Sequence, residues 1–166
     1  MVDAGLLGED DRVELLEGEI IDRSPIGSRH AACVARLTSI FAARLAAGAM
    51  VWPQNPIRLG HLSEPQPDVT VLRRRDDFYA ADLPGAADVV IVIEVADTSL
   101  TIDRDVKAPI YGRAGVAELW IVDLEGEAVE ILSGPSPEGY TQRQHLGRGD
   151  TLAAAGVTVT VDEILG

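Results

Sequence analysis

The chain has 166 residues, a net charge of −13 and a single cysteine, Cys33. This length fits one domain over residues 1–166, and a hydrophobic content of 46% supports a sizeable core, which excludes global disorder. The lone cysteine excludes an internal disulfide framework, and the acidic balance argues against broad electrostatic attraction to nucleic acid.

No membrane or export segment is evident in the sequence. The N-terminal stretch MVDAGLLGEDD is acidic and lacks the long apolar region of a signal peptide. No run reaches the roughly 18 apolar residues that a membrane span needs. We expect a soluble cytoplasmic protein in which Cys33, within the apolar stretch AACVARL, is a buried and unreactive thiol.

The first half of the chain predicts a hairpin, a helix and two extended segments. RVELLEGEIID, residues 12–22, predicts two short strands around a turn at Glu17-Gly18. Residues 30–47 carry apolar side chains at helical spacing, and Gly48 is a plausible stop. MVWPQNPIRL is expected to be extended. PQPDVTVL predicts a strand opened by prolines, and a polar loop follows over residues 73–88.

The second half predicts a strand–helix–strand unit and a meander. Residues 89–96 predict a strand buried on both faces. A short helix over 101–115 is expected to be capped by Thr101 or Asp103 and ended by Gly115. A strand in AELWIVDLEG follows, and AVEIL, GYTQRQHL and GVTVTV predict three further strands. The order indicates an α/β fold with a mixed sheet and a helix on each face, in which 89–96 and 118–123 are parallel.

Glu94 interrupts the most apolar of these strands, VVIVIEVAD, residues 89–97. A buried carboxylate without a partner costs several kcal/mol or else loses its charge. A metal ion, a lysine or water at the strand end would each account for it.

Three residues form the candidate site: Asp68, Glu94 and the only lysine, Lys107. If the strands of the two acids are neighbours, the acids share one hard cation such as Mg²⁺, which is completed by waters and substrate phosphate. Lys107 would then position the attacking water or stabilise developing negative charge. In the alternative reading, Asp68 is a strand-entry residue and Glu94 forms a structural pair with Lys107.

Four stretches resemble the Uma2 family of endonucleases (DUF820), within the restriction-endonuclease-like PD-(D/E)XK nuclease superfamily. They are RVELLEGEIIDRSPIGSRH, EPQPDVTVL, IVIEVADTSLTIDRDVKAPIYGRAGVAELWIVD and GYTQRQHLGRGDTL, and they cover nearly the whole chain in the family's order. The resemblance makes Pro67-Asp68 the PD element and Glu94 the second acid. Ala96 stands where the superfamily's usual lysine lies, and the resemblance implies that Lys107 on the following helix replaces it.

The resemblance also implies an αβββαβ core with extra antiparallel strands at the C-terminus, Mg²⁺ dependence with Mn²⁺ as a substitute, and homodimers. Superfamily members often add an acid from the first helix, but residues 30–47 contain no Asp or Glu. Glu14 or Glu19 is therefore expected to supply it, and we favour Glu19. His30 is a candidate phosphate contact or helix-start residue, and Gln66 is a candidate supporting residue beside the PD element.

Arginines supply the expected phosphate contacts, because such contacts usually come from Arg and Lys. We prefer Arg104 and Arg113, which lie on the predicted helix that carries Lys107. The alternative cluster, Arg73, Arg74 and Arg75, is more simply explained as part of a solvated loop.

The function predicted is a Mg²⁺-dependent endonuclease that hydrolyses phosphodiester bonds, with DNA the expected substrate. One alternative is a nuclease-fold module with weak or no catalysis that binds nucleic acid or protein. Another is a self-associating structural domain. The net charge of −13 favours the alternatives, whereas the complete set of two acids and a lysine favours the enzyme.

Overall fold

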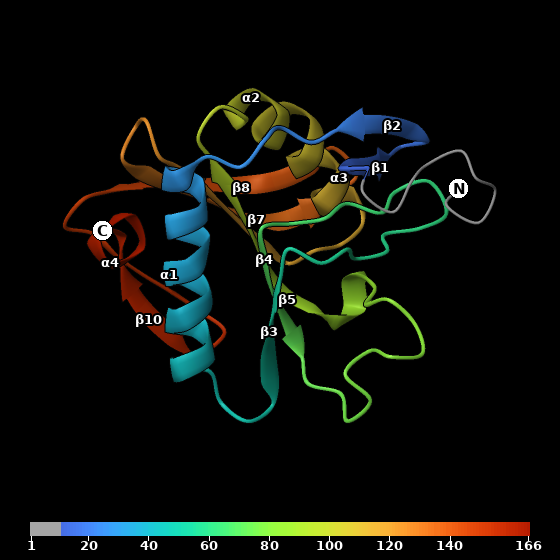
Figure 1. Ribbon diagram of the computed structural model, residues 1–166, viewed down its shortest axis with the longest axis horizontal. Coiled ribbons are helices and arrows are strands. Elements are labelled where there is room, and N and C mark those ends of the chain that lie inside the picture. Colours follow the sequence, from blue (N-terminus) through green and yellow to red (C-terminus); the bar gives the residue numbers. More distant parts are fainter. Residues whose placement is uncertain (1–10) are drawn as a thin grey trace.

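The protein is built around one six-stranded mixed sheet, seen in a computed structural model that describes residues 11–166 (Figure 1). The strand order is β3-β4-β5-β6-β7-β8. The strands are β3 (Ala49–Pro53), β4 (Val69–Arg73), β5 (Val89–Ala96), β6 (Glu118–Asp123), β7 (Ala128–Ser136) and β8 (Gly139–Gly147). The expectation that no signal peptide is present rests mainly on residues 1–10, which lie outside the described residues.

The pairing of β5 with β6 is parallel, and the other neighbours in this sheet are antiparallel. The predicted mixed α/β sheet and the parallel strand–helix–strand unit are therefore confirmed. Every residue of β5 except Val90 is buried, as its continuous apolar run indicates.

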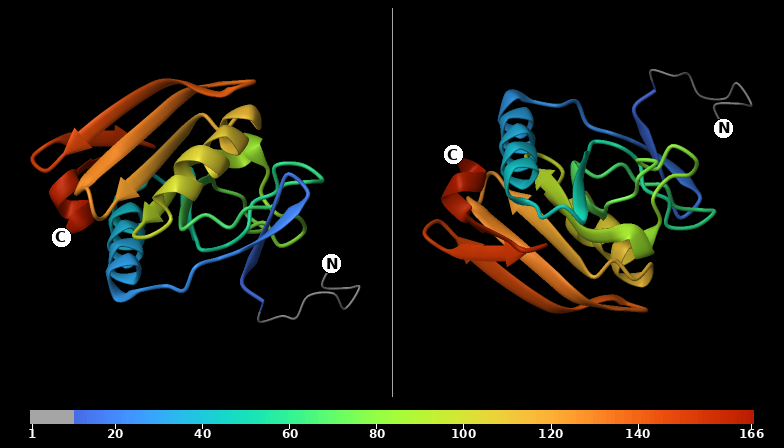
Figure 2. Two further views of the ribbon diagram at one scale, coloured as in Figure 1. Left: turned by 90° about the horizontal axis from the view of Figure 1, so that it is seen from above. Right: turned by 90° about the horizontal axis from the view of Figure 1, so that it is seen from below.

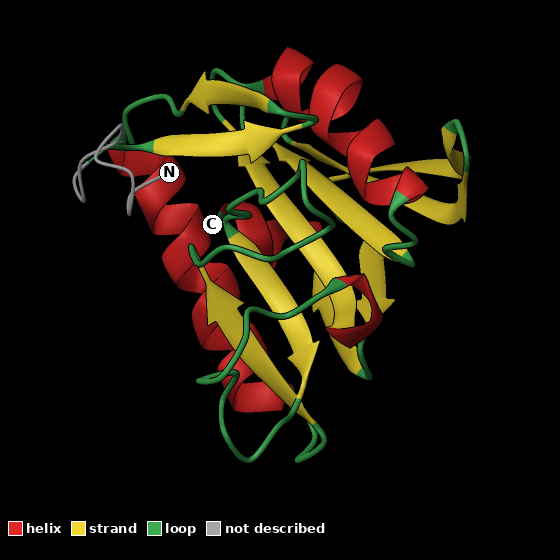
Figure 3. Cartoon of the chain, turned by 90° about the vertical axis from the view of Figure 1, so that its right-hand side faces the viewer, coloured by secondary structure: helices red, strands yellow, loops and turns green. Residues whose placement is uncertain are grey.

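Two helical segments cover opposite faces of the sheet (Figure 3). Helix α1 (Ser28–Arg44) packs on the face that carries Ile91, Ile93 and Val95 of β5, in one hydrophobic cluster. Helix α3 (Ala108–Arg113) packs on the face that carries Val92, in a second cluster. Because side chains alternate along a strand, Glu94 lies on the same face as Val92, toward α3.

Helix α1 ends earlier than its apolar spacing predicts. Its last helical residue is Arg44, and Leu45 has an extended backbone. Gly48 is therefore not the stop. Leu45 packs against the core cluster of α1, so burial of this side chain accompanies the turn toward β3.

The segment before α3 is less regular than predicted. It consists of α2 (Leu100–Ile102), a π-helical turn η2 (Asp103–Lys107) and then α3. Neither Thr101 nor Asp103 caps it, since the N-cap residue is Ser99 and makes no side-chain cap bond. Asp103 is instead buried inside the molecule.

The C-terminal strands differ from the predicted meander. β7 and β8 do form a hairpin of the main sheet, but β10 (Val157–Thr160) pairs with the unpredicted β9 (Thr151–Ala154) in a separate small sheet. The β9–β10 hairpin and α4 (Val161–Leu165) lie beside α1 (Figure 2). Arg36 of α1 donates hydrogen bonds to the carbonyl oxygens of Ile164 and Leu165, which hold the two elements together.

The predicted N-terminal hairpin is confirmed as β1 (Val13–Leu16) and β2 (Glu19–Asp22). It lies over the same end of the sheet as α2 (Figure 1). Residues 23–27, hereafter the strap, connect it to α1. Cys33 is fully buried and burial raises the pKa of its thiol to about 11, as expected for an unreactive cysteine. No helix among residues 11–166 is long and apolar enough to cross a membrane.

Candidate active site

Asp68 and Glu94 lie side by side because β4 and β5 are antiparallel neighbours. The pairing of Val69 with Ile93 continues by one position to Asp68 beside Glu94. The Oδ2 atom of Asp68 accepts the backbone N–H of Val95 at 2.9 Å, and the Nε2 atom of His30 lies 3.0 Å from the same oxygen. Sheet pairing therefore brings together the two acids that are twenty-six positions apart in the chain.

Glu94 has two partners on one oxygen. Its Oε1 atom is 2.6 Å from Nζ of Lys107 and accepts a hydrogen bond of 2.5 Å from the hydroxyl of Tyr111. Lys107 and Tyr111 stand four residues apart, one helical turn, so both face β5. These contacts explain how a carboxylate is tolerated inside the most apolar strand.

Glu14 of β1 is the third carboxylate at this site. Its Oε1 atom is 3.0 Å from Nζ of Lys107 and accepts the backbone N–H of Gln66 at 2.6 Å. Glu14 is 6% exposed, whereas Glu19 is exposed on the hairpin and does not line the cavity described below. The preference for Glu19 is thus corrected: β1 points Glu14 inward, with Leu16, in the alternating pattern of a strand.

Asp103 is a fourth buried carboxylate, although its position in the sequence suggested only a helix cap. It is 4% exposed, and its Oδ2 atom accepts a 2.6 Å hydrogen bond from Ser99 Oγ. Asp103 stands one helical turn before Lys107, and this spacing could have placed it on the side of the helix that carries the lysine. Tyr111 was missed for a similar reason, because it follows Lys107 at the same interval.

Four carboxylates share the site with one lysine, and burial perturbs the pKa values of two of them. Burial raises the pKa of Glu94 to about 8 and that of Asp103 to about 6, although the ammonium of Lys107 opposes both shifts. Asp68 differs, since His30 and the Val95 N–H lower its pKa despite burial. The hydrogen bond to Asp68 in turn raises the pKa of His30. Arg23, His30 and protons on Glu94 and Asp103 balance part of this negative charge, and the remainder suits a cation.

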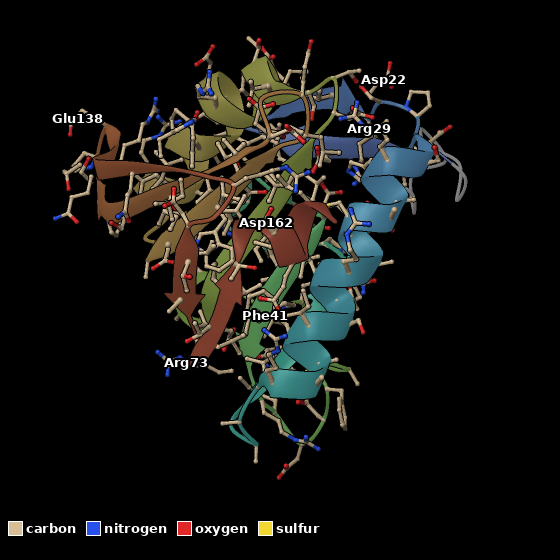
Figure 4. All side chains as sticks on the ribbon, turned by 90° about the vertical axis from the view of Figure 1, so that its left-hand side faces the viewer. Asp22, Arg29, Phe41, Arg73, Glu138 and Asp162 are labelled. Atoms are coloured by element: carbon tan, nitrogen blue, oxygen red, sulfur yellow. The ribbon has the colours of Figure 1, made fainter. Side chains whose placement is uncertain are left out.

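A cavity of about 200 Å³ opens at these side chains. It is bounded by the hairpin, the strap, the start of α1 and the segment 97–107, and Asp68, Glu94 and Lys107 form part of its wall. Asp22 and Arg29, on either side of the strap, lie at the same end of the molecule in Figure 4. Arg29 and Asp97 form an ion pair of 3.4 Å, which connects α1 to the segment 97–107 beside the cavity.

The remaining predicted site residues lie elsewhere. Gln66 donates its side-chain N–H to the carbonyl oxygen of Gln54 and is not part of the cavity wall. Arg104 pairs with Glu130 of β7, and Arg113 pairs with Glu17 in the hairpin turn. Neither arginine lines the cavity, whereas Arg12 and Arg23, which the sequence analysis did not select, do.

The donor set of the cavity fits a hard, hydrated cation. Among residues 11–166, no three His, Cys, Asp or Glu side chains are grouped closely enough to hold a metal ion by themselves. Mg²⁺ does not need such a cage, because it binds through one or two carboxylates and keeps several waters. Asp68 and Glu94 supply two neighbouring carboxylates, and burial together with the nearby carboxylates raises the pKa of Glu94.

Comparison with known proteins agrees with this fold and identifies a family. A family model described as "Uma2: Putative restriction endonuclease" matches residues 4–162. A crystal structure of a "putative nuclease belonging to DUF820" from Anabaena variabilis superposes with a TM-score of 0.75 at 16% identity, covering 98% of this chain and 94% of that chain. No protein with a curated description matches significantly. The family match supports a nuclease function in general, and the structural match supports the fold.

Proposed function

Because the chain belongs to the Uma2 family, we propose that it is a Mg²⁺-dependent endonuclease that hydrolyses phosphodiester bonds of DNA, with Mn²⁺ as a substitute metal. The observation that carries the proposal is the position of Asp68 and Glu94 side by side in a cavity wall, next to the buried Lys107. A nuclease needs this combination because the reaction places negative charge on a phosphoryl group that already carries one.

Asp68 and Glu94 would hold the metal. When bound, Mg²⁺ would polarise a phosphoryl oxygen and lower the pKa of a coordinated water. The contacts around each acid suit this role, because the close hydrogen-bond partners of each acid converge on one of its carboxylate oxygens, and Arg23 lies no nearer than 3.8 Å to the other oxygen of Asp68. His30 and the Val95 N–H share Oδ2 of Asp68, and Lys107 and Tyr111 share Oε1 of Glu94.

Lys107 supplies a fixed positive charge at the reacting group. Its ammonium is 5% exposed and lies between Glu94 and Glu14, 2.6 Å and 3.0 Å from their respective Oε1 atoms. An ammonium held this way either orients the attacking water or stabilises the phosphorane-like charge of the transition state. Glu14 positions Lys107, and its own position is fixed by the Gln66 N–H.

A homodimer would allow two such sites to act on the two strands of DNA. The edge strands β3 and β8 of the sheet are the elements available for extending it across a two-fold axis. Sedimentation velocity at micromolar concentration would test this part of the proposal, and a monomer at all concentrations would contradict it.

The function is tested by measuring Mg²⁺ binding and plasmid nicking on the same samples. We expect wild-type protein to bind Mg²⁺ in calorimetry and to nick supercoiled plasmid, and Asp68→Asn to lose both. Asp82→Asn removes an exposed acid in the loop before β5 and should change neither. Metal binding and nicking that survive in Asp68→Asn would contradict the proposed site.

The alternative function, a nuclease-fold module that binds nucleic acid or protein with little catalysis, is favoured by one observation: the net charge of −13. Mg²⁺ binding without nicking of any DNA or RNA substrate would support that alternative against the endonuclease.

A further inference from the structure

The cavity carries two features that the metal site does not use: an arginine held inside it and an apolar rim. The side chain of Arg23 is 13% exposed, and its Nη2 atom lies 3.8 Å from Oδ1 of Asp68. This distance is too long for a direct hydrogen bond. A guanidinium placed beside the metal-binding acid, without a close bond to it, is suited to bind a phosphate oxygen, for which Arg has matching geometry.

The rim of the cavity is formed in part by two isoleucines from different elements. Ile26 belongs to the strap and Ile102 to α2, both line the cavity, and each is 40% exposed. Apolar side chains beside a charged cavity offer a surface for a ligand that carries an apolar face as well as a phosphate. A nucleotide has this combination, because the faces of its base are apolar. In a duplex these faces are covered by stacking, so only an unpaired base can present them.

The burial of the acids and the net charge of the protein both favour a substrate that enters the cavity and binds partly through its base. Asp68 is 5% exposed and Glu94 2% exposed, so the phosphate that reacts must enter the cavity. The arginines in the cavity wall are Arg12 and Arg23, in a chain whose net charge is −13. Few phosphates can be neutralised by such a surface, so contacts to the base must contribute much of the binding.

We propose that the cavity accepts an unpaired nucleotide, with Arg23 on the phosphate and Ile26 and Ile102 against the base, so that the substrate is single-stranded or frayed nucleic acid. This inference rests on the proposed nuclease function and specifies its substrate. It also replaces Arg104 and Arg113, which lie outside the cavity wall, with Arg23 as the phosphate contact.

The first test compares a 12-nucleotide single-stranded DNA with a hairpin duplex of the same sequence. Binding is measured by fluorescence anisotropy with Ca²⁺ in place of Mg²⁺. We expect the single strand to bind at least tenfold more tightly. Its log–log salt slope should be about −1.4, because roughly two phosphate contacts at about −0.7 each are available. Equal or tighter binding of the duplex, or a slope steeper than about −4, would overturn the inference.

Substitutions test the two contacts separately. Ile26→Ser combined with Ile102→Ser should weaken binding of the single strand about tenfold, yet leave binding of an oligonucleotide with an abasic site at its centre within twofold. Leu62→Ser, which alters an isoleucine-sized side chain that is 62% exposed and outside the cavity wall, is the matched control and should have no effect. Equal losses for both oligonucleotides would contradict a contact to the base.

Arg23→Gln should weaken binding of the single strand about tenfold without weakening binding of Mg²⁺ measured by calorimetry. If Arg23 only positioned Asp68, its loss would weaken Mg²⁺ binding as well. Arg74→Gln removes an equal charge in the loop after β4, outside the cavity wall, and serves as the control.

The proposed endonuclease activity and the proposed single-stranded substrate can be contradicted separately. Tight binding and cleavage of the hairpin duplex would overturn the substrate inference and leave the endonuclease intact. Absence of both Mg²⁺ binding and nucleic-acid binding would overturn both.

Discussion

At the scale of single residues, the candidate site depends most on the side chain of Lys107. It is the only lysine of the chain, and it is buried between Glu94 and Glu14 with Asp103 one helical turn away. A buried ammonium is stable only because carboxylates surround it, and those carboxylates depend on it equally. Its structural role and its proposed chemical role are therefore inseparable.

Lys107→Met should cost about 3–5 kcal/mol of unfolding free energy, the usual loss when one partner of a buried ion pair is removed. The same change should abolish nicking. Urea unfolding gives the free energy. Arg113→Met, which removes a cation from an ion pair of partly exposed side chains with Glu17, is the control and should cost less than about 1 kcal/mol. Equal losses in the two variants would mean that Lys107 is not held as the contacts indicate.

Glu94 makes the metal-free protein less stable as the pH rises. Its pKa in the folded state is about 8, above its ordinary value of 4.5, so the folded state holds a proton that the unfolded state releases. Stability from this group is fully present below about pH 4.5 and is lost as the pH rises to about 8. Asp103 and His30, whose pKa values are also raised, act in the same direction.

In EDTA we therefore expect the unfolding free energy of wild type to fall by about 2 kcal/mol or more between pH 5 and pH 8. Glu94→Gln should flatten this dependence and exceed wild type in stability at pH 8. Urea titrations at four pH values measure both. Parallel pH profiles for the two proteins would show that Glu94 is ionised throughout this range.

At the scale of elements, local patterns predicted most of the fold and failed where tertiary packing decides. The buried strand at 89–96 and the hairpin turn at Glu17-Gly18 follow from composition and turn chemistry. The end of α1 at Arg44 does not, because the side chain of Leu45 is recruited to the core. The short strand β9 was not predicted for a related reason. It has only four residues, and it is stabilised mainly by its partner β10.

The placement of Lys107 depends on how closely α3 approaches β8. A Cβ added to Gly112 would lie 2.2 Å from the carbonyl oxygen of Gly139, so the backbones of the two elements are in contact there. Gly112→Ala should push them apart at a cost of about 1–3 kcal/mol. It should also reduce nicking, since α3 continues directly from Lys107.

The control for this prediction is Gly48→Ala. No atom lies within 4 Å of a Cβ added at Gly48, and we expect a change within about 0.5 kcal/mol. Chemical denaturation of both variants measures the difference. A Gly112→Ala protein as stable as Gly48→Ala would show that α3 can move from β8 without cost.

For the molecule as a whole, the sequence selected three residues that the structure brings together, but not the residues that surround them. Asp68, Glu94 and Lys107 could be selected because two lie on adjacent predicted strands and one is chemically unique in the chain. Asp103 and Tyr111 could have been selected only from their four-residue spacing around Lys107, and Arg23 could not be selected, because its position depends on which segments cover the end of the sheet. Choosing between Glu14 and Glu19 requires knowing which side chains of the hairpin point inward. A strand of four residues specifies this poorly.

The net charge of −13 also affects stability, and its general effect must be separated from metal binding. Any salt reduces self-repulsion among the acidic side chains and raises the melting temperature somewhat. A specific site adds to this by mass action, about 2.7 kcal/mol at a Mg²⁺ concentration of 100 times Kd. For a chain of this size, that corresponds to a shift of about 5–10 °C.

We therefore expect MgCl₂ to raise the melting temperature by several degrees more than NaCl of equal ionic strength, and EDTA to reverse the difference. Asp68→Asn should respond equally to the two salts, whereas Asp82→Asn should keep the response of wild type. Thermal unfolding followed by circular dichroism measures these shifts. If MgCl₂ and NaCl stabilise wild type to the same extent, Mg²⁺ acts only by screening the acidic surface, and the four buried carboxylates must then be balanced by Lys107, His30 and bound protons instead of a metal ion.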